Sequence, residues 1–223
     1  GRLSPSSLKA DCVTPRLAAA LARGRNRSVT IAPEAGSERM RRLIAKGITE
    51  DDILSAVSAV AAEKVRELKL YFMVGLPEET AEDVAAIADL VLECKRILDA
   101  KSGGSRLTIA VSPFIPKAGT PWERRPMATL DTIRQSLSLL KSRLPKKGVS
   151  LHTESVAWSE VQAALARGNS SFAPVIIATG EATLPSWHRA LEECGVDAPS
   201  YAHKEWTDDG KLPWDMINLG PKR

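Results

Sequence analysis

Residues 30–47 read TIAPEAGSERMRRLIAKG, an apolar strand pattern that passes through a Pro, Glu and Gly turn into a helical pattern. Two later stretches repeat this design: LKLYFMVGLPEET at 68–80 and IAVSPFIPKAGTPW at 109–122. The three expected strands begin 39 residues apart, near Ser28, Glu67 and Arg106. Strand–helix units of this length predict right-handed crossovers and a parallel sheet, whose functional groups lie where the strands end.

Local signals bound the other expected elements. Thr14-Pro15 is typical of a helix start, and Gly24 can close that helix. Thr49 with Asp52, and Thr80 with Asp83, resemble capping boxes. Helices are further expected over 38–45, 130–144 and 155–167, and VSLHT at 149–153 could be one more strand. We therefore predict an α/β fold: a partial parallel (β/α) TIM-like barrel over 1–150, with a small α-rich carboxyl-terminal extension over 151–223 packed on it.

Composition narrows the class of protein. The chain has 223 residues, of which 43% are hydrophobic and 26% charged, as in ordinary globular proteins. No apolar run approaches the roughly 20 residues that span a bilayer, so no membrane partner is expected. Three widely separated cysteines suit a reducing compartment rather than a disulfide framework. We expect a cytoplasmic protein.

The net charge of +4 is mild and is partly clustered. Basic residues gather at 23–27, 39–42 and 146–147. Solvated helix ends explain most of them, because cations favour the carboxyl ends of helices. An RNA-binding surface is the alternative, although no aromatic residues interleave these clusters.

The strand-end motifs PEAGSER, YFMVGLPEET and SPFIPKAGTPW resemble the second half of the radical S-adenosylmethionine (SAM) barrel. The chain is most similar to the group often preceded by a cobalamin-binding domain, and its carboxyl-terminal stretches FAPVII, SWHRALEECG and LPWDMI are similar to one uncharacterised bacterial subgroup. The resemblance implies a parent enzyme that binds SAM and cleaves it reductively to a 5′-deoxyadenosyl radical with a [4Fe–4S] cluster. The substrate is not implied.

The cysteine signature of that family, CxxxCxxC, is absent from this chain. Cys12, Cys94 and Cys194 are more than 80 residues apart in sequence and cannot form a local thiolate nest. We expect the cluster to be held by a missing amino-terminal part of the same polypeptide, so that this chain alone would be inactive. Cobalamin, if the parent uses it, would also bind upstream. The three histidines lack ligand spacing, so no metal residue is predicted.

The strand at 67–74 alternates in polarity. Leu68, Leu70, Phe72 and Val74 would pack under the helices, while Lys69, Tyr71 and Met73 would point into the barrel lumen. A lumen that holds Lys and Tyr suits a polar ligand; a wet sheet edge is the alternative for Lys69.

The resemblance implies roles for residues at the strand ends. It places Glu34 beside the SAM ribose, Lys46 at the SAM carboxylate, and both Pro113 and Phe114 over the adenine. The alternatives are helix capping for Glu34 and Lys46, a simple turn for the serines at 4, 6 and 7, and a buried aromatic for Phe114. The full expected set is Ser7, Glu34, Lys46, Tyr71, Met73, Val74, Gly75, Pro113 and Phe114.

Two other functions stay open. A cluster-free parallel barrel could bind a nucleotide or RNA, with binding that weakens steeply with salt. An interaction scaffold could use the Trp-rich carboxyl-terminal part. No nucleophile motif or phosphate-binding loop is present, and no catalytic residue is identified.

Overall fold

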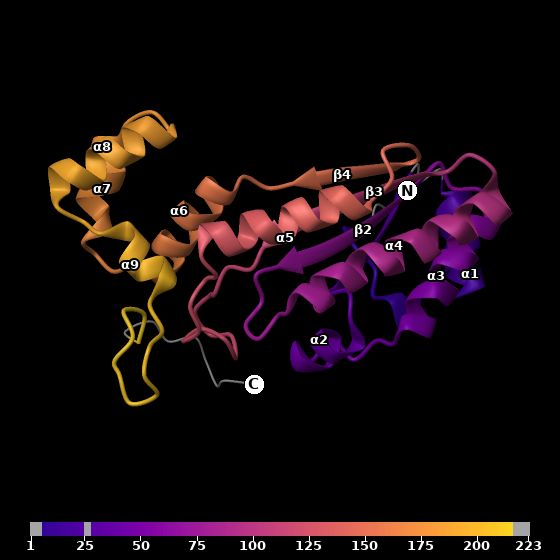
Figure 1. The fold of residues 1–223 in the computed structure, drawn as a ribbon, viewed down its shortest axis with the longest axis horizontal. Coiled ribbons are helices and arrows are strands. Elements are labelled where there is room, and N and C mark those ends of the chain that lie inside the picture. The colour runs from indigo at the N-terminus through magenta and orange to yellow at the C-terminus, as the bar shows by residue number, and fades with distance from the viewer. Residues whose placement is uncertain (1–5, 25–27, 216–223) are drawn as a thin grey trace. The chain divides into compact units, whose positions relative to one another are not determined.

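The computed structural model describes residues 6–24 and 28–215 (Figure 1). Its sheet has four strands in the order β1-β2-β3-β4: Ser28–Glu34, Glu67–Val74, Arg106–Pro113 and Val149–Thr153. β1 pairs with β2 and β3 with β4 in parallel. This confirms the predicted α/β fold and a parallel sheet consistent with a partial TIM-like barrel. Ser4, the arginines at 25 and 27 and the end of LPWDMI lie outside the described residues.

Helices connect the strands as the capping signals predicted. The 3-10 turn η1 (Ala10–Cys12) and the helix α1 (Pro15–Arg23) precede β1. The helices α2 (Glu38–Leu43) and α3 (Glu50–Ala62) lie between β1 and β2, α4 (Ala81–Ser102) follows β2, and α5 (Leu130–Arg143) follows β3. α2 is shorter than expected. The backbone of Ala45 turns to a φ of +53°, and the Lys46 N–H donates to the Arg41 carbonyl, which closes the helix early.

The chain divides into two compact units. The first consists of residues 1–74, 78–112 and 135–153, and the second of 75–77, 113–134 and 154–223. The second contains α6 (Val156–Arg167), α7 (Phe172–Thr179), α8 (Leu184–Cys194) and α9 (Ala198–His203), around a core that includes Phe172 and Trp187. The expected division at residue 150, with the extension packed on the barrel, stays a prediction.

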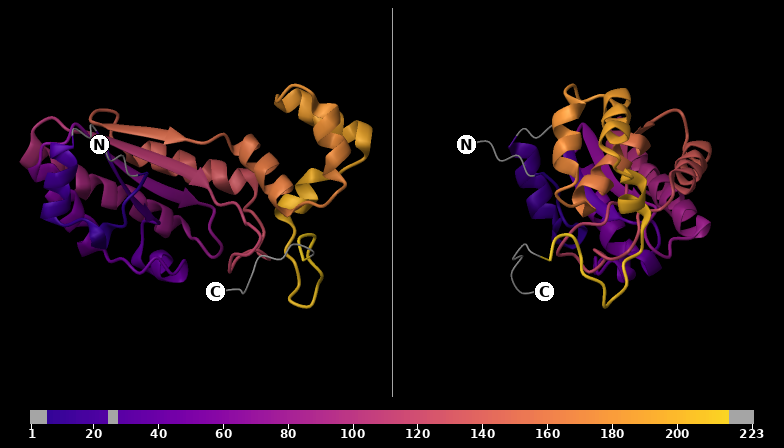
Figure 2. Two further views of the ribbon diagram at one scale, coloured as in Figure 1. Left: turned by 180° about the vertical axis from the view of Figure 1, so that it is seen from behind. Right: turned by 90° about the vertical axis from the view of Figure 1, so that its left-hand side faces the viewer.

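The sheet has one buried face and one open face. Leu68, Leu70, Phe72 and Val74 are all at most 1% exposed, while Lys69 and Met73 are half-buried and Tyr71 is exposed. α4 and α5 lie in front of the strands in Figure 1 and behind them in the reversed view of Figure 2. The helices therefore cover the apolar face, and the alternation predicted for β2 is confirmed.

The turn after β1 packs directly on the backbone of α4. A Cβ atom placed on Gly36 would lie 2.6 Å from the carbonyl carbon of Ala86 and 2.7 Å from the Cα atom of Ile87. No side chain fits between backbone segments at this distance, so only glycine permits the approach. Gly36 thereby fixes the position of the loop that carries Glu34.

One buried carboxylate ties this loop to the start of α4. Asp83 closes the capping box of α4 by accepting from the Thr80 N–H at 2.9 Å. It also accepts from the Ser37 hydroxyl at 2.5 Å and from the Arg39 guanidinium. Arg39 in turn donates to the Glu78 carbonyl at 2.8 Å, so the loops that follow β1 and β2 are joined through Asp83.

The hydrogen bonds also set the protonation of Asp83. Burial by itself would raise the pKa of this carboxyl, but the bonds from Arg39, Ser37 and Thr80 outweigh burial and hold its pKa well below the ordinary value. Asp83 is therefore a carboxylate throughout the physiological pH range.

We predict that Gly36→Ala lowers the free energy of unfolding by about 2–3 kcal/mol, because the new methyl group forces α4 and the loop apart. Gly104→Ala is the control, since a Cβ there meets nothing within 4 Å. Urea denaturation of both variants measures the effect. Equal stabilities would show that the loop does not pack on α4 as described.

The lowered pKa of Asp83 predicts that the folded protein loses stability in acid. Its folded-state pKa is depressed, so its stabilisation is present above the unfolded pKa and is lost as the pH falls below about 4. The unfolding free energy of the wild type should drop between pH 6 and pH 3, and Asp83→Asn should be less stable at pH 6 with a smaller drop. Asp209→Asn, at an exposed carboxyl, is the control. An identical pH profile for Asp83→Asn and wild type would contradict this reading.

Candidate functional site

The carboxyl end of β1 carries a paired acid and base. Glu34 Oε1 and Lys46 Nζ lie 3.0 Å apart, and their side chains are 28% and 23% exposed. This partial burial makes the pair stronger than a solvated one, yet leaves both groups accessible to a ligand. Glu34 has a φ of +69°, a left-handed conformation that is uncommon for residues other than glycine. The structure thus holds a carboxylate and an ammonium group together where the sequence predicted both.

A buried arginine builds the loop between them. Arg41 is fully buried and donates from Nη1 to the carbonyls of Ala35, at 3.1 Å, and Gly36, at 2.6 Å, and from Nε to that of Ile48, at 3.2 Å. Burial lowers the pKa of Arg41. Its Nη2 has no partner among the described residues. Arg41 therefore acts as an internal brace of the loop and retains one buried donor.

This brace corrects the expected basic cluster at 39–42. Arg41 is inside the protein, and Arg39 is bound to Asp83 and Glu78. Arg42 is exposed but lies 3.5 Å from Glu38. The prediction of a solvated helix end holds for Arg39 and Arg42, which are exposed, and is wrong for Arg41, which is buried.

The expected residues of β2 split between the two faces of the sheet. Tyr71 and Met73 are on the open face, in the first unit with Glu34 and Lys46. Val74 is fully buried on the helix side, so only its backbone could meet a ligand. Ser7 is exposed.

The other expected residues belong to the second unit. Gly75 has a φ of +75°, and a Cβ there would lie 3.0 Å from the Ala128 methyl group, which explains the glycine. Pro113 is buried, and the Phe114 ring meets Trp122 edge-to-face at 5.4 Å. A packed aromatic was the alternative that the sequence left open for Phe114.

The cysteines do not fit an iron–sulfur cluster. Cys12 is exposed, Cys94 is buried in α4, and Cys194 ends α8 in the second unit. Burial raises the pKa of the Cys94 thiol to about 12, which disfavours the thiolate that ligates iron. Within residues 6–24 and 28–215, no three His, Cys, Asp or Glu side chains gather as a metal site would require.

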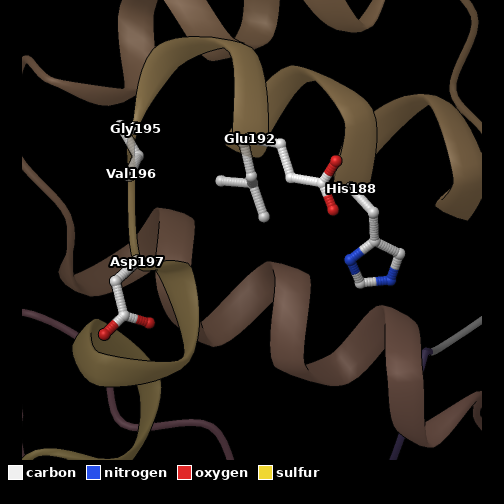
Figure 3. Close-up of a pocket in the computed structure, with 6 residues that line it drawn as sticks. His188, Glu192, Gly195, Val196 and Asp197 are labelled. Carbon is white, nitrogen blue, oxygen red and sulfur yellow. The ribbon is translucent and has the colours of Figure 1, made fainter.

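The second unit has a shallow pocket of about 390 Å³, and none of its lining residues is an expected site residue. Figure 3 shows His188 and Glu192 projecting from α8 into the same space, with Asp197 beyond the helix end. Its lining is completed by Leu191, Gly195 and Val196. None of these residues is among the site residues that the sequence predicts at the strand ends. The volume of this pocket therefore does not identify the predicted SAM site.

Sequence reasoning missed the long-range roles of Arg41 and Asp83. Asp83 was recognised through its capping box, a local signal that cannot reveal the bonds to Ser37 and Arg39. No periodicity distinguishes a buried arginine from an exposed one.

Among the residues that the structure describes, no helix has the length and apolar character that crossing a bilayer requires.

Comparison with known proteins agrees with this geometry. Residues 3–91, which include β1, β2 and both loops joined by Asp83, match the family model of the radical SAM superfamily. The chain is also 35% identical, over 169 residues, to an uncharacterised protein of Methanocaldococcus jannaschii. That alignment covers 76% of this chain and 36% of the relative, so the chain spans about a third of that protein's length. Residues 3–91 of this chain therefore carry a radical SAM superfamily domain, and the parallel sheet that contains β1 and β2 is consistent with it.

Proposed function

We propose that this chain forms part of the SAM-binding wall of a radical SAM enzyme. The observation that carries the proposal is the Glu34–Lys46 pair at the carboxyl end of β1. SAM has an amino-acid end, with one ammonium and one carboxylate, and an adenosyl end with a ribose diol. A carboxylate beside an ammonium group is complementary to such a ligand in both charge and hydrogen bonding.

The backbone at this site supports ligand contact rather than simple helix capping. The cap of α2 is already supplied by Ser37, whose hydroxyl accepts from the Met40 N–H at 3.1 Å. Glu34 is therefore not needed as the cap, although its left-handed backbone costs about 1–3 kcal/mol. Strain that is kept at an exposed polar group is typical of binding sites.

Each residue has a distinct role in the proposal. Lys46 donates to the SAM carboxylate, and Glu34 accepts from the ribose diol or from the ammonium group. Tyr71 and Met73 line the adjacent open face, and the backbone of Met73 and Val74 flanks the adenine. The unpaired Nη2 of Arg41, a residue of α2 that braces this loop, is the kind of buried donor that a ligand oxygen or a water satisfies.

A [4Fe–4S] cluster, when present, would supply the electron that cleaves SAM to a 5′-deoxyadenosyl radical. The cysteines of this chain do not fit its ligation, so the proposal assigns the cluster to residues outside this sequence, and gives this chain no catalytic activity alone. This chain's share is to bind and orient SAM and to keep water away from it.

We predict that Lys46→Met weakens SAM binding at least tenfold, because the charge partner of the SAM carboxylate is lost. Binding of 5′-methylthioadenosine, which lacks the amino-acid end, should change less than twofold. Isothermal titration calorimetry with both ligands measures this selectivity. An equal loss of affinity for both ligands would show that Lys46 does not contact the SAM carboxylate. Unchanged affinity for both ligands would contradict the proposed site.

Glu34→Gln distinguishes the two alternative partners of the Glu34 carboxylate, the ribose diol and the ammonium group of SAM. Weakened binding of both ligands would assign Glu34 to the ribose diol, and weakened binding of SAM alone would assign it to the ammonium group. Glu93→Gln is the matched control, because Glu93 forms an ion pair with Arg96 on the exposed side of α4. If Glu34→Gln and Glu93→Gln bind both ligands as the wild type does, Glu34 does not contact SAM.

A further inference from the structure

The open face of the sheet is unusual for parallel strands. Parallel sheets are normally covered on both faces, and their strands are then apolar throughout. Here one face is apolar and packed, while the other presents hydroxyl, imidazole and ammonium groups. A protein layer that covered this face would need apolar partners. The polar residues indicate instead a ligand-lined lumen.

The register brings these groups together. Thr30 of β1 lies beside Lys69 of β2, and Ala110 of β3 lies beside His152 of β4. The Arg106 N–H donates to the Arg66 carbonyl at 2.9 Å. In a parallel ladder such a bond aligns Arg106 with the next residue, Glu67, so that four residues further along Ala110 aligns with Tyr71. Tyr71 and His152 thus stand two strands apart, roughly 10 Å, with the small Ala110 between them.

Lys69 is the cation that this face offers to an anion, and its ion-pair partner Glu67 lies on the same face. Lys69 is 37% exposed, and its recorded ion pair is with Glu67 at 3.8 Å, a weak contact for partly solvated groups. Glu67 is itself engaged, since its Oε1 accepts from the Thr108 hydroxyl at 2.7 Å. The carboxylate is therefore partly satisfied by a neutral donor. Lys69, Tyr71, Thr30 and His152 retain hydrogen-bond donors toward the open side.

We propose that this face, defined by Thr30, Lys69, Tyr71 and His152, is a subsite for a small anionic substrate that carries a carboxylate or phosphate group. Lys69 and the neighbouring hydroxyls of Thr30 and Tyr71 hold the anionic group, and the His152 imidazole, two strands away from Tyr71, contacts another part of the substrate. The inference rests on the proposed function, because it places the substrate on the same open face as Tyr71 and Met73. It goes beyond it by assigning a chemical class to the substrate.

The test is a titration of the full chain with two probes, sodium phosphate and sodium succinate, at constant ionic strength. Backbone amide NMR shifts report the site. The shifts should concentrate at residues 30, 69 and 71, and Lys69→Met should raise the dissociation constant of the preferred probe at least tenfold. Lys69→Arg should retain binding, which separates lost charge from lost packing. The probe that binds with the lower dissociation constant shows whether the substrate carries a phosphate or a carboxylate group.

Two controls separate this inference from the SAM site. Lys146→Met removes the same charge from an exposed residue after α5 and should leave probe binding within twofold of wild type. Glu34→Gln should not change probe binding, and Lys69→Met should not change the binding of 5′-methylthioadenosine. Shifts spread over all basic residues, or equal effects of Lys69→Met and Lys146→Met, would overturn the subsite while leaving the SAM proposal intact.

Discussion

The site depends on the buried carboxylate of Asp83. It caps α4, accepts from the Ser37 hydroxyl that begins α2, and pairs with Arg39, which reaches the loop after β2. Two loops that are distant in sequence are thereby fixed at the carboxyl edge of adjacent parallel strands. Gly36 allows the close approach that these bonds require. Without this connection each loop would be held only by its own strand and helix.

A rigid loop explains how Glu34 can hold a strained backbone beside Lys46. Arg41 bonds to two consecutive carbonyls of the loop, so the turn cannot relax without leaving a buried guanidinium unpaired. The Glu34–Lys46 pair is therefore a preorganised carboxylate and ammonium rather than two mobile side chains. The same sheet offers a second polar region around Lys69, on the face that the helices do not cover.

The fold could be predicted from the sequence because its signals are periodic and local. The alternation at Leu68–Val74 determines which face is buried, and capping residues locate the starts of α3 and α4. The pairing of Glu34 with Lys46 was not predicted, although each residue was assigned to the site individually. The buried state of Arg41 and the bonds of Asp83 depend on contacts between distant segments, and neither residue type nor spacing encodes them. His152 was dismissed as a metal ligand, and only the strand register brought it to the open face.

Hydrogen–deuterium exchange of the chain with and without SAM tests the central claim most directly. SAM bound at the carboxyl edge of β1 and β2 should slow amide exchange in peptides that cover residues 33–47 and 70–74, while α7 and α8 remain unchanged. Protection in these two segments, absent from the Lys46→Met variant, is the result that this account predicts. Protection confined to α7 and α8, or no difference under saturating SAM, would contradict the assignment of the SAM-binding wall to this chain.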